Sequence, residues 1–130
     1  MRIAQTAALW AVRIAGLFQI ILGLGLWFGS GRQYLALHMR VGLLFVVSMW
    51  VLGTLALVTR GPRGLAVVTI GWGALVYALG VGQMYLVPTS AHWVVQLAHL
   101  VVGLAAIAIA GRLGRQQLAA PQAVSRPSPS

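Results

Sequence analysis

Long uncharged apolar runs, separated by arginines, dominate the pattern of hydrophobic and polar positions along this chain. Residues 15–28 are apolar except for Gln19, residues 41–58 carry no charge, and residues 64–110 form one uncharged run. The third run exceeds the roughly 20 residues of one membrane span, and Val87-Pro88-Thr89-Ser90 divides it with a turn and helix-start signal. The pattern therefore predicts four helices, at about residues 5–29, 32–59, 64–87 and 90–112.

The connections between these predicted helices are short. They are Gly29-Ser30-Gly31, Arg60-Gly61-Pro62-Arg63 and Pro88-Thr89. Short connections place consecutive helices side by side and antiparallel. We therefore expect an all-α polytopic membrane protein, with a four-helix up-down-up-down transmembrane bundle over residues 1–112. Residues 113–130 are rich in Gln, Pro, Ala and Ser, which predicts a disordered cytoplasmic tail.

Composition supports the membrane class. The 130-residue chain is 60% hydrophobic and 7% charged, whereas soluble domains are typically about 25% charged. So little polar material cannot cover the core of a soluble protein. The nine charged residues are all Arg, and most lie at predicted helix ends. This distribution is typical of membrane anchors and not of a nucleic-acid-binding surface.

The residue types that the chain lacks exclude several classes of chemistry. Without Asp or Glu there is no carboxylate pair for glycoside hydrolysis, no Ser-His-Asp triad and no membrane carboxylate for proton-coupled antiport. Without Cys there is no disulfide exchange, thiolate zinc or iron–sulfur cluster. The ionisable side chains that remain are those of Arg, His and Tyr.

The positions of the arginines predict how the helices are oriented. Arg13 and Arg40 fall within predicted spans, and Arg32 flanks one side of the bundle. The other side is flanked by Arg2, Arg60, Arg63, Arg112, Arg115 and Arg126. Under the positive-inside rule both termini and the middle loop are cytoplasmic. We expect an integral protein of a bacterial inner membrane.

The two predicted hairpins share matched patterns, which we interpret as an internal repeat; chance similarity is the alternative, because Gly and Leu are common in membrane helices. Glycines 16, 23 and 25 in the first helix have the same spacing as glycines 73, 80 and 82 in the third, at an offset of 57 residues (Gly16 to Gly73). His38 and His99 each begin the sequence His-x-x-Val-Gly-Leu, at an offset of 61 residues. A parallel repeat of this kind implies a pseudo-twofold axis along the membrane normal. Such an axis places the second helix diagonally opposite the fourth.

His38 and His99 are predicted to lie at one depth. They follow the candidate N-caps Ser30 and Ser90 at similar spacings, about 12–14 Å along each helix at 1.5 Å per residue. Two imidazoles at matched height on facing helices are the axial ligands that a bis-His haem b requires. Structural pairing between helices remains an alternative. A copper or zinc ion is another, although two His under-supply a tetrahedral site.

Small residues near the two histidines predict room for a porphyrin ring, because Gly has no side chain. The candidates on the first and third helices are Gly16, Gly23, Gly25, Gly73, Gly80 and Gly82. Gly42 and Gly103 follow each His by four residues, on the same helix face. Arg32, at the outer surface, is the predicted partner of a haem propionate.

Arg40 and His92 are polar residues whose roles stay open. The candidate partners of Arg40 are a haem propionate, a lipid phosphate, backbone carbonyls and an acidic residue of another subunit. Because Arg40 lies two residues from His38, we expect it on a different helix face, which favours the lipid or the partner subunit. His92 lies seven residues before His99 and shares its face. A propionate or a quinone head group is one candidate neighbour, and an interfacial position beside Trp93 is the simpler interpretation.

This arrangement resembles the four-helix haem core of respiratory and photosynthetic cytochrome b. That core has axial His on its second and fourth helices, matched here by His38 and His99. It has glycines on its first and third helices, matched here by residues 16, 23, 25, 73, 80 and 82. The resemblance covers residues 5–112 and implies one bis-His haem b in the outer half of the bilayer. This chain has one His pair where that family has two.

We therefore expect a membrane haem b protein that carries electrons between quinone and a partner redox protein. It would be an electron-transfer protein or an oxidoreductase subunit and not a stand-alone enzyme. Membrane lipid and an acidic membrane subunit are further expected partners; nucleic acid is not. Two alternatives remain open. One is a non-redox accessory subunit or assembly factor of a larger membrane complex, and the other is a small anion channel or transporter lined by Arg13 and Arg40.

Overall fold

The computed structural model describes residues 1–29, 31–83, 85 and 90–119, and all regular structure in these residues is helical. The elements are α1 (Arg2–Trp27), the short 3-10 helix η1 (Arg32–Tyr34), α2 (Leu35–Val58), α3 (Arg63–Gly82) and α4 (His92–Ala119). Each of the four α-helices is long and apolar enough to cross a membrane. The predicted all-α class with four long apolar helices is thus confirmed.

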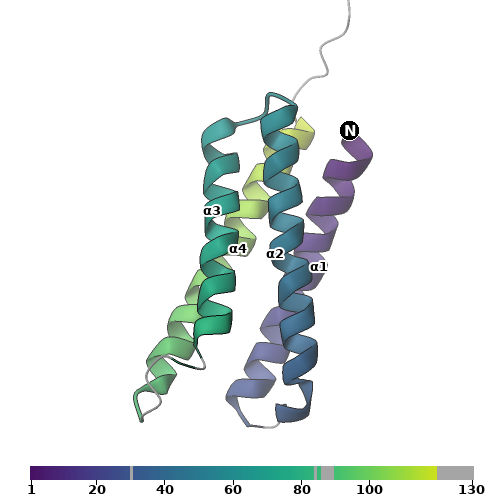
Figure 1. Cartoon of the computed structure of the whole chain (residues 1–130). Coiled ribbons are helices and arrows are strands. Elements are labelled where there is room, and N and C mark those ends of the chain that lie inside the picture. Colours follow the sequence, from purple (N-terminus) through teal and green to yellow (C-terminus); the bar gives the residue numbers. More distant parts are fainter. Residues whose placement is uncertain (30, 84, 86–89, 120–130) are drawn as a thin grey trace, which may run out of the picture.

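The four helices form a bundle in which each packs against its neighbours (Figure 1). α1 contacts α2 and α4, and α3 contacts the same two helices. α2 also touches α4 across the bundle, whereas α1 and α3 do not touch within the described residues. The diagonal placement of the second and fourth helices agrees with the prediction from the repeat. We call the end where α1 and α3 end the distal end, and the end that carries the N-terminus the proximal end.

Backbone conformation explains where the first two helices end. Gly29 has φ +74° and its N–H bonds to the Leu26 carbonyl, so the left-handed conformation closes α1 two residues before the predicted end. Arg60 has φ +57° and follows α2, and Pro62 then precedes α3. α3 ends at Gly82, short of the predicted residue 87. Ser30 and residues 86–89, which marked predicted connections, lie outside the described residues.

The last helix corrects the predicted boundary of the tail. α4 begins at His92 and continues to Ala119, so residues 113–119 are helical and not disordered. The physical reason is burial: Leu113, Gly114 and Gln117 pack inside the bundle. The Gln117 Nε2 donates a hydrogen bond of 2.9 Å to the Leu52 carbonyl of α2. Residues 120–130 of the predicted tail lie outside the described residues.

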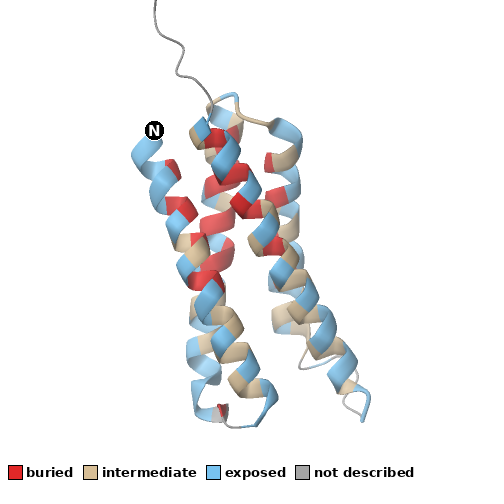
Figure 2. Cartoon of the chain, turned by 180° about the vertical axis from the view of Figure 1, so that it is seen from behind, coloured by how far each residue is buried: buried red, intermediate tan, exposed pale blue. Residues whose placement is uncertain are grey.

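Buried side chains gather in the proximal half of the bundle (Figure 2). The largest with almost no exposed surface are Val12, Val46, Met49, Leu52, Thr69 and Leu113. Toward the distal ends of the same helices, in residues 17–27, 35–44, 77–82 and 92–105, no described residue is buried. The packed core therefore lies at one end, and the predicted histidine site lies at the other.

Two tryptophan side chains link α3 to α2 and α4 where the packed core meets the distal part of the bundle. The Trp50 indole N–H on α2 donates to the Ile70 carbonyl on α3, at 3.1 Å. The Trp72 indole N–H on α3 donates to the Val102 carbonyl on α4, at 2.9 Å. Both indoles thus act in packing between helices. These bonds fix the helices where the core ends and the open half begins.

Candidate functional site: a histidine pair between two cavities

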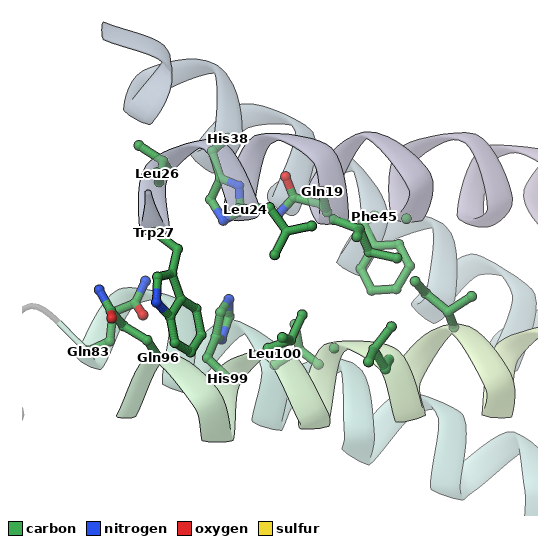
Figure 3. A pocket seen from close by; sticks show the side chains of 17 residues that line it. Gln19, Leu24, Leu26, Trp27, His38, Phe45, Gln83, Gln96, His99 and Leu100 are labelled. Atoms are coloured by element: carbon green, nitrogen blue, oxygen red, sulfur yellow. The ribbon is translucent and has the colours of Figure 1, made fainter. Parts of the chain in front are cut away.

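His38 of α2 and His99 of α4 face each other across the distal half of the bundle (Figure 3). Their ring centroids are 6.5 Å apart and the ring planes are inclined by 63°. The Nδ1 atom of each ring is buried and has no hydrogen-bond partner in the structure. The prediction that the two histidines meet at one level on diagonally opposed helices is confirmed. A buried ring nitrogen without a partner is costly, so the pair has unused bonding capacity.

Gly23 and Gly80 lie directly against the two imidazoles. A Cβ atom built at Gly23 of α1 would lie 3.4 Å from the Cε1 of His38. A Cβ atom built at Gly80 of α3 would lie 3.4 Å from the Cε1 of His99. Each hairpin thus packs its own glycine against its own histidine, in the same way in both halves of the repeat. A methyl group at either position would reach ordinary contact distance from the ring, so each glycine borders the imidazole of its own hairpin.

One cavity lies between α1 and α4, on one side of the histidine pair (Figure 3). Its volume is about 130 Å³. Trp27, Gln83 and Gln96 gather at its distal end, and Phe45 lies toward the packed core. The remaining lining is mostly aliphatic, with His38 and His99 between these ends. We call it the α1–α4 cavity.

A second cavity lies between α2 and α3, on the other side of the same pair, and its volume is about 410 Å³. We call it the α2–α3 cavity. Its polar lining residues, besides those shared with the α1–α4 cavity, are Arg40, Tyr77 and Tyr85. The residues common to both cavities are Gln19, His38, Val76, Gln83 and His99. The histidine pair is therefore the partition between two adjoining spaces.

The two cavities are related by the sequence repeat. The offset of 61 residues converts the α2 lining into the α4 lining: His38, Met39, Gly42, Leu43 and Val46 become His99, Leu100, Gly103, Leu104 and Ile107. The offset of 57 residues likewise converts Ile20, Gly23 and Leu24 of α1 into Tyr77, Gly80 and Val81 of α3. Matched positions of the two hairpins thus line both cavities around one central pair of rings, although the volumes differ, at about 130 and 410 Å³.

Arg40 also lines the α2–α3 cavity, together with His38. Its side chain is exposed, whereas that of His38 is partly buried. The two residues are two positions apart on α2, so the expectation that Arg40 lies on a different helix face stays a prediction. The corresponding residue of α4 is Val101.

The other predicted glycines divide between packing and open positions. A Cβ at Gly16 would approach Ile107 to 2.9 Å, and one at Gly73 would lie 3.0 Å from the Trp50 Nε1, so both sit in helix seams. A Cβ at Gly42 would lie 2.7 Å from the Gln19 amide nitrogen. A Cβ at Gly103, which lines the α1–α4 cavity, would meet no atom within 4 Å.

Gly25, Gly73 and Gly82 line neither cavity, so their predicted contact with a cofactor finds no support in their positions. His92 is the first residue of α4 and also lines neither. The side chain of Arg32, the predicted propionate partner, lies outside the described part of the structure. Arg13, proposed for an anion path, places its guanidinium 5.2 Å from the centre of the Trp10 ring and lines neither cavity.

The donor set limits what the site could hold. Within the described residues, no three His, Cys, Asp or Glu side chains come close enough to hold a metal ion together. Two imidazoles alone leave a bare metal ion short of ligands. A haem supplies four ligands from its own ring and needs only the two axial nitrogens. The residues present therefore fit a haem better than a free ion.

Sequence reasoning did not identify several lining residues of the two cavities, which are Gln19, Trp27, Tyr77, Gln83, Tyr85 and Gln96. The matched positions of the two hairpins are the signal that could have pointed to this lining. Applying the offsets of 57 and 61 residues to the positions near His38 and His99 pairs residues of one hairpin with residues of the other, and shows where the two hairpins differ. In comparisons with protein-family models, curated proteins and solved structures, no match to this chain was found.

Proposed function

We propose that this chain is an integral membrane protein that binds one haem b between His38 and His99 and carries electrons. The observation that carries the proposal is the facing pair of imidazoles, 6.5 Å apart, between two matched cavities. Each His comes from a different hairpin, so a group held by both would join the two halves of the repeat.

The separation of the rings suits a shared metal. The ring centroids are 6.5 Å apart, which is close enough for both imidazoles to hold one group between them. Each ring has a buried Nδ1 without a hydrogen-bond partner in the structure. His38 and His99 would supply the two protein nitrogens that a haem needs.

The position and lining of the two cavities suit a flat, apolar cofactor. A flat group held by both imidazoles would lie between His38 and His99, with the two cavities beside it. The α1–α4 and α2–α3 cavities adjoin the histidine pair on its two sides. The lining is mostly aliphatic and aromatic, which is typical of sites for flat apolar cofactors. The open distal half is also where such a group would replace missing core contacts.

Charge placement supports insertion with the proximal end in the cytoplasm. The described arginines at the proximal end are Arg2, Arg60, Arg63, Arg112 and Arg115, and Arg32 is the one at the distal end. An excess of Arg on one side marks the cytoplasmic side of membrane proteins. The helices would then run up-down-up-down, and the histidine pair would lie in the outer half of a membrane such as the bacterial inner membrane.

The haem would supply one-electron redox chemistry, and the protein would set its ligands, surroundings and access. The chain contains no Asp or Glu, and the α2–α3 cavity holds Arg40. A neutral to basic surrounding favours the reduced, less positive iron and raises the potential. The electron donor or acceptor in the membrane would be a quinone, and the other partner a redox protein at the outer surface.

The test is the reduced-minus-oxidised visible spectrum of the detergent-purified chain from cells supplied with haem. We expect a sharp α band and a shifted Soret band in the wild type. His38→Ala and His99→Ala should each lose the low-spin bands, because one axial nitrogen is gone. His92→Ala is the matched control, since it removes a His of α4 that lines neither cavity, and it should keep the full spectrum.

Two results would overturn the proposal. One is a flat spectrum in the wild type after haem supply, which would leave the pair as a contact between helices. The other is an unchanged spectrum in both single His variants, which would place any haem elsewhere.

A further inference from the structure

The two cavities share a backbone plan but differ in charge. At matched positions Arg40 replaces Val101, Tyr77 replaces Ile20, and Tyr85 replaces Phe28. All three polar replacements line the α2–α3 cavity. Leu35 of α2 corresponds to Gln96 of α4; Leu35 lines the α2–α3 cavity, and Gln96 lines the α1–α4 cavity. One cavity therefore carries a cation and two phenols, whereas the other carries only neutral groups besides the shared histidines.

No carboxylate of an acidic side chain can neutralise Arg40, because the chain contains no Asp or Glu. Arg40 lies in the sixth position of α2, beyond the helix start, and faces a cavity of about 410 Å³. Arginine within an apolar helix is costly unless an anion pairs with it. The rest of the lining is largely apolar, including Leu35, Leu43 and Val81. The expected occupant thus has one negative group and an apolar body.

We propose that the α2–α3 cavity binds the carboxylate end of an apolar molecule, with Arg40 as the counter-charge. The planar guanidinium matches a carboxylate with two parallel hydrogen bonds. The phenol O–H groups of Tyr77 and Tyr85 are additional donors on the same lining. A single positive charge balances a single carboxylate, and a pocket of this size accepts a one-chain or plate-shaped body.

Two molecules supply this chemistry. One is a haem whose propionate reaches Arg40, and this source rests on the function proposed above. The other is a fatty acid from the surrounding membrane, which does not require haem. Both place a carboxylate beside Arg40 and an apolar body among the aliphatic lining, so the experiment needs one arm for each.

The haem arm compares haem with its dimethyl ester, in which both propionates are uncharged. We expect the purified wild-type apoprotein to bind haem at least about tenfold more tightly than the ester, the size of one charge-assisted pair. Arg40→Gln should bring that ratio close to one, and Arg40→Lys should restore most of it. Arg13→Gln is the matched control, because Arg13 is also within a helix but contacts Trp10 and lines neither cavity.

The fatty-acid arm compares oleate with oleyl alcohol by titration calorimetry on the same four proteins in a non-ionic detergent. If a fatty acid is the source, oleate binds the wild type more tightly than the alcohol, and Arg40→Gln removes the difference. Circular dichroism checks that every variant keeps the helical content of the wild type.

The outcomes separate this proposal from the haem proposal. Dependence on Arg40 in the haem arm supports both. Dependence in the oleate arm, with no haem spectrum in any protein, supports the carboxylate site and removes the haem function. Ratios that Arg40→Gln leaves unchanged in both arms overturn the carboxylate site, whether or not haem binds between His38 and His99.

Discussion

The proximal and distal halves of this bundle are built from the same four helices and similar apolar residues, yet only the proximal half is packed. Met49 and Leu52 of α2 have no exposed surface, whereas Leu43 and Leu44 of the same helix are each about half exposed, at 52% and 55%. In the distal half the histidine pair stands between two cavities. The difference shows that the polypeptide closes one end by itself and leaves space at the other.

Glycines mark the same contrast. A Cβ at Gly53, in the proximal half of α2, would lie 2.6 Å from Ile70 and 3.1 Å from the Ala66 carbonyl. A Cβ at Gly103, in the distal half of α4, would meet nothing within 4 Å. The first glycine brings two helices together, and the second borders a space. Helix contacts therefore stabilise the proximal half, while the distal half is arranged around whatever occupies its cavities.

The largest expected difference between the halves comes from two leucines of α4. Leu113→Ala empties a fully buried position and should lower the free energy of unfolding by about 2–5 kcal/mol. Leu104→Ala changes a side chain that is 47% exposed and should cost less than about 1 kcal/mol. Reversible unfolding of both variants in mixed detergent micelles, followed by circular dichroism, measures the two values. Equal losses would mean that the halves do not differ in packing.

A smaller difference is expected from adding one methyl group in each half. Gly53→Ala places a methyl group of α2 against Ile70 and the Ala66 carbonyl of α3, which must shift. This substitution should destabilise the bundle by about 1–3 kcal/mol. Gly103→Ala enters open space, and it should be neutral or stabilise the helix by up to about 1 kcal/mol, because Ala has the higher helix propensity. The same unfolding measurement compares them. A clear loss at Gly103→Ala would show that the distal space is closed in the folded protein.

The smallest expected effect concerns the end of α4. Gln117→Ala removes the hydrogen bond to the Leu52 carbonyl and should cost about 0.5–1.5 kcal/mol. Gln116→Ala is the control, because Gln116 is exposed on the same turn, and it should change stability by less than about 0.5 kcal/mol. Thermal unfolding in detergent detects this difference. Indistinguishable variants would argue that the last turns of α4 do not hold α2.

Local sequence patterns predicted the elements better than their ends. Three long apolar runs, the third divided at residues 87–90, predicted four helices, and the structure has four helices long and apolar enough to cross a membrane. The ends at Gly29 and Arg60 depend on single left-handed residues, and the extension of α4 depends on burial of Leu113 and Gln117 by other helices. A composition rich in Gln does not report such contacts. The predicted disordered start of the tail at residue 113 was wrong for this reason.

The matched sequence contexts of His38 and His99 were enough to predict that the two rings meet, because equivalent positions of two similar hairpins lie at similar depths. The packing of the four helices was needed to show that Arg40 lines the α2–α3 cavity, that Gly73 packs on Trp50, and that the space on each side of the pair stays open. A repeat fixes which positions correspond. Where a long side chain reaches, and which gaps its neighbours leave unfilled, depends on how four helices pack at once.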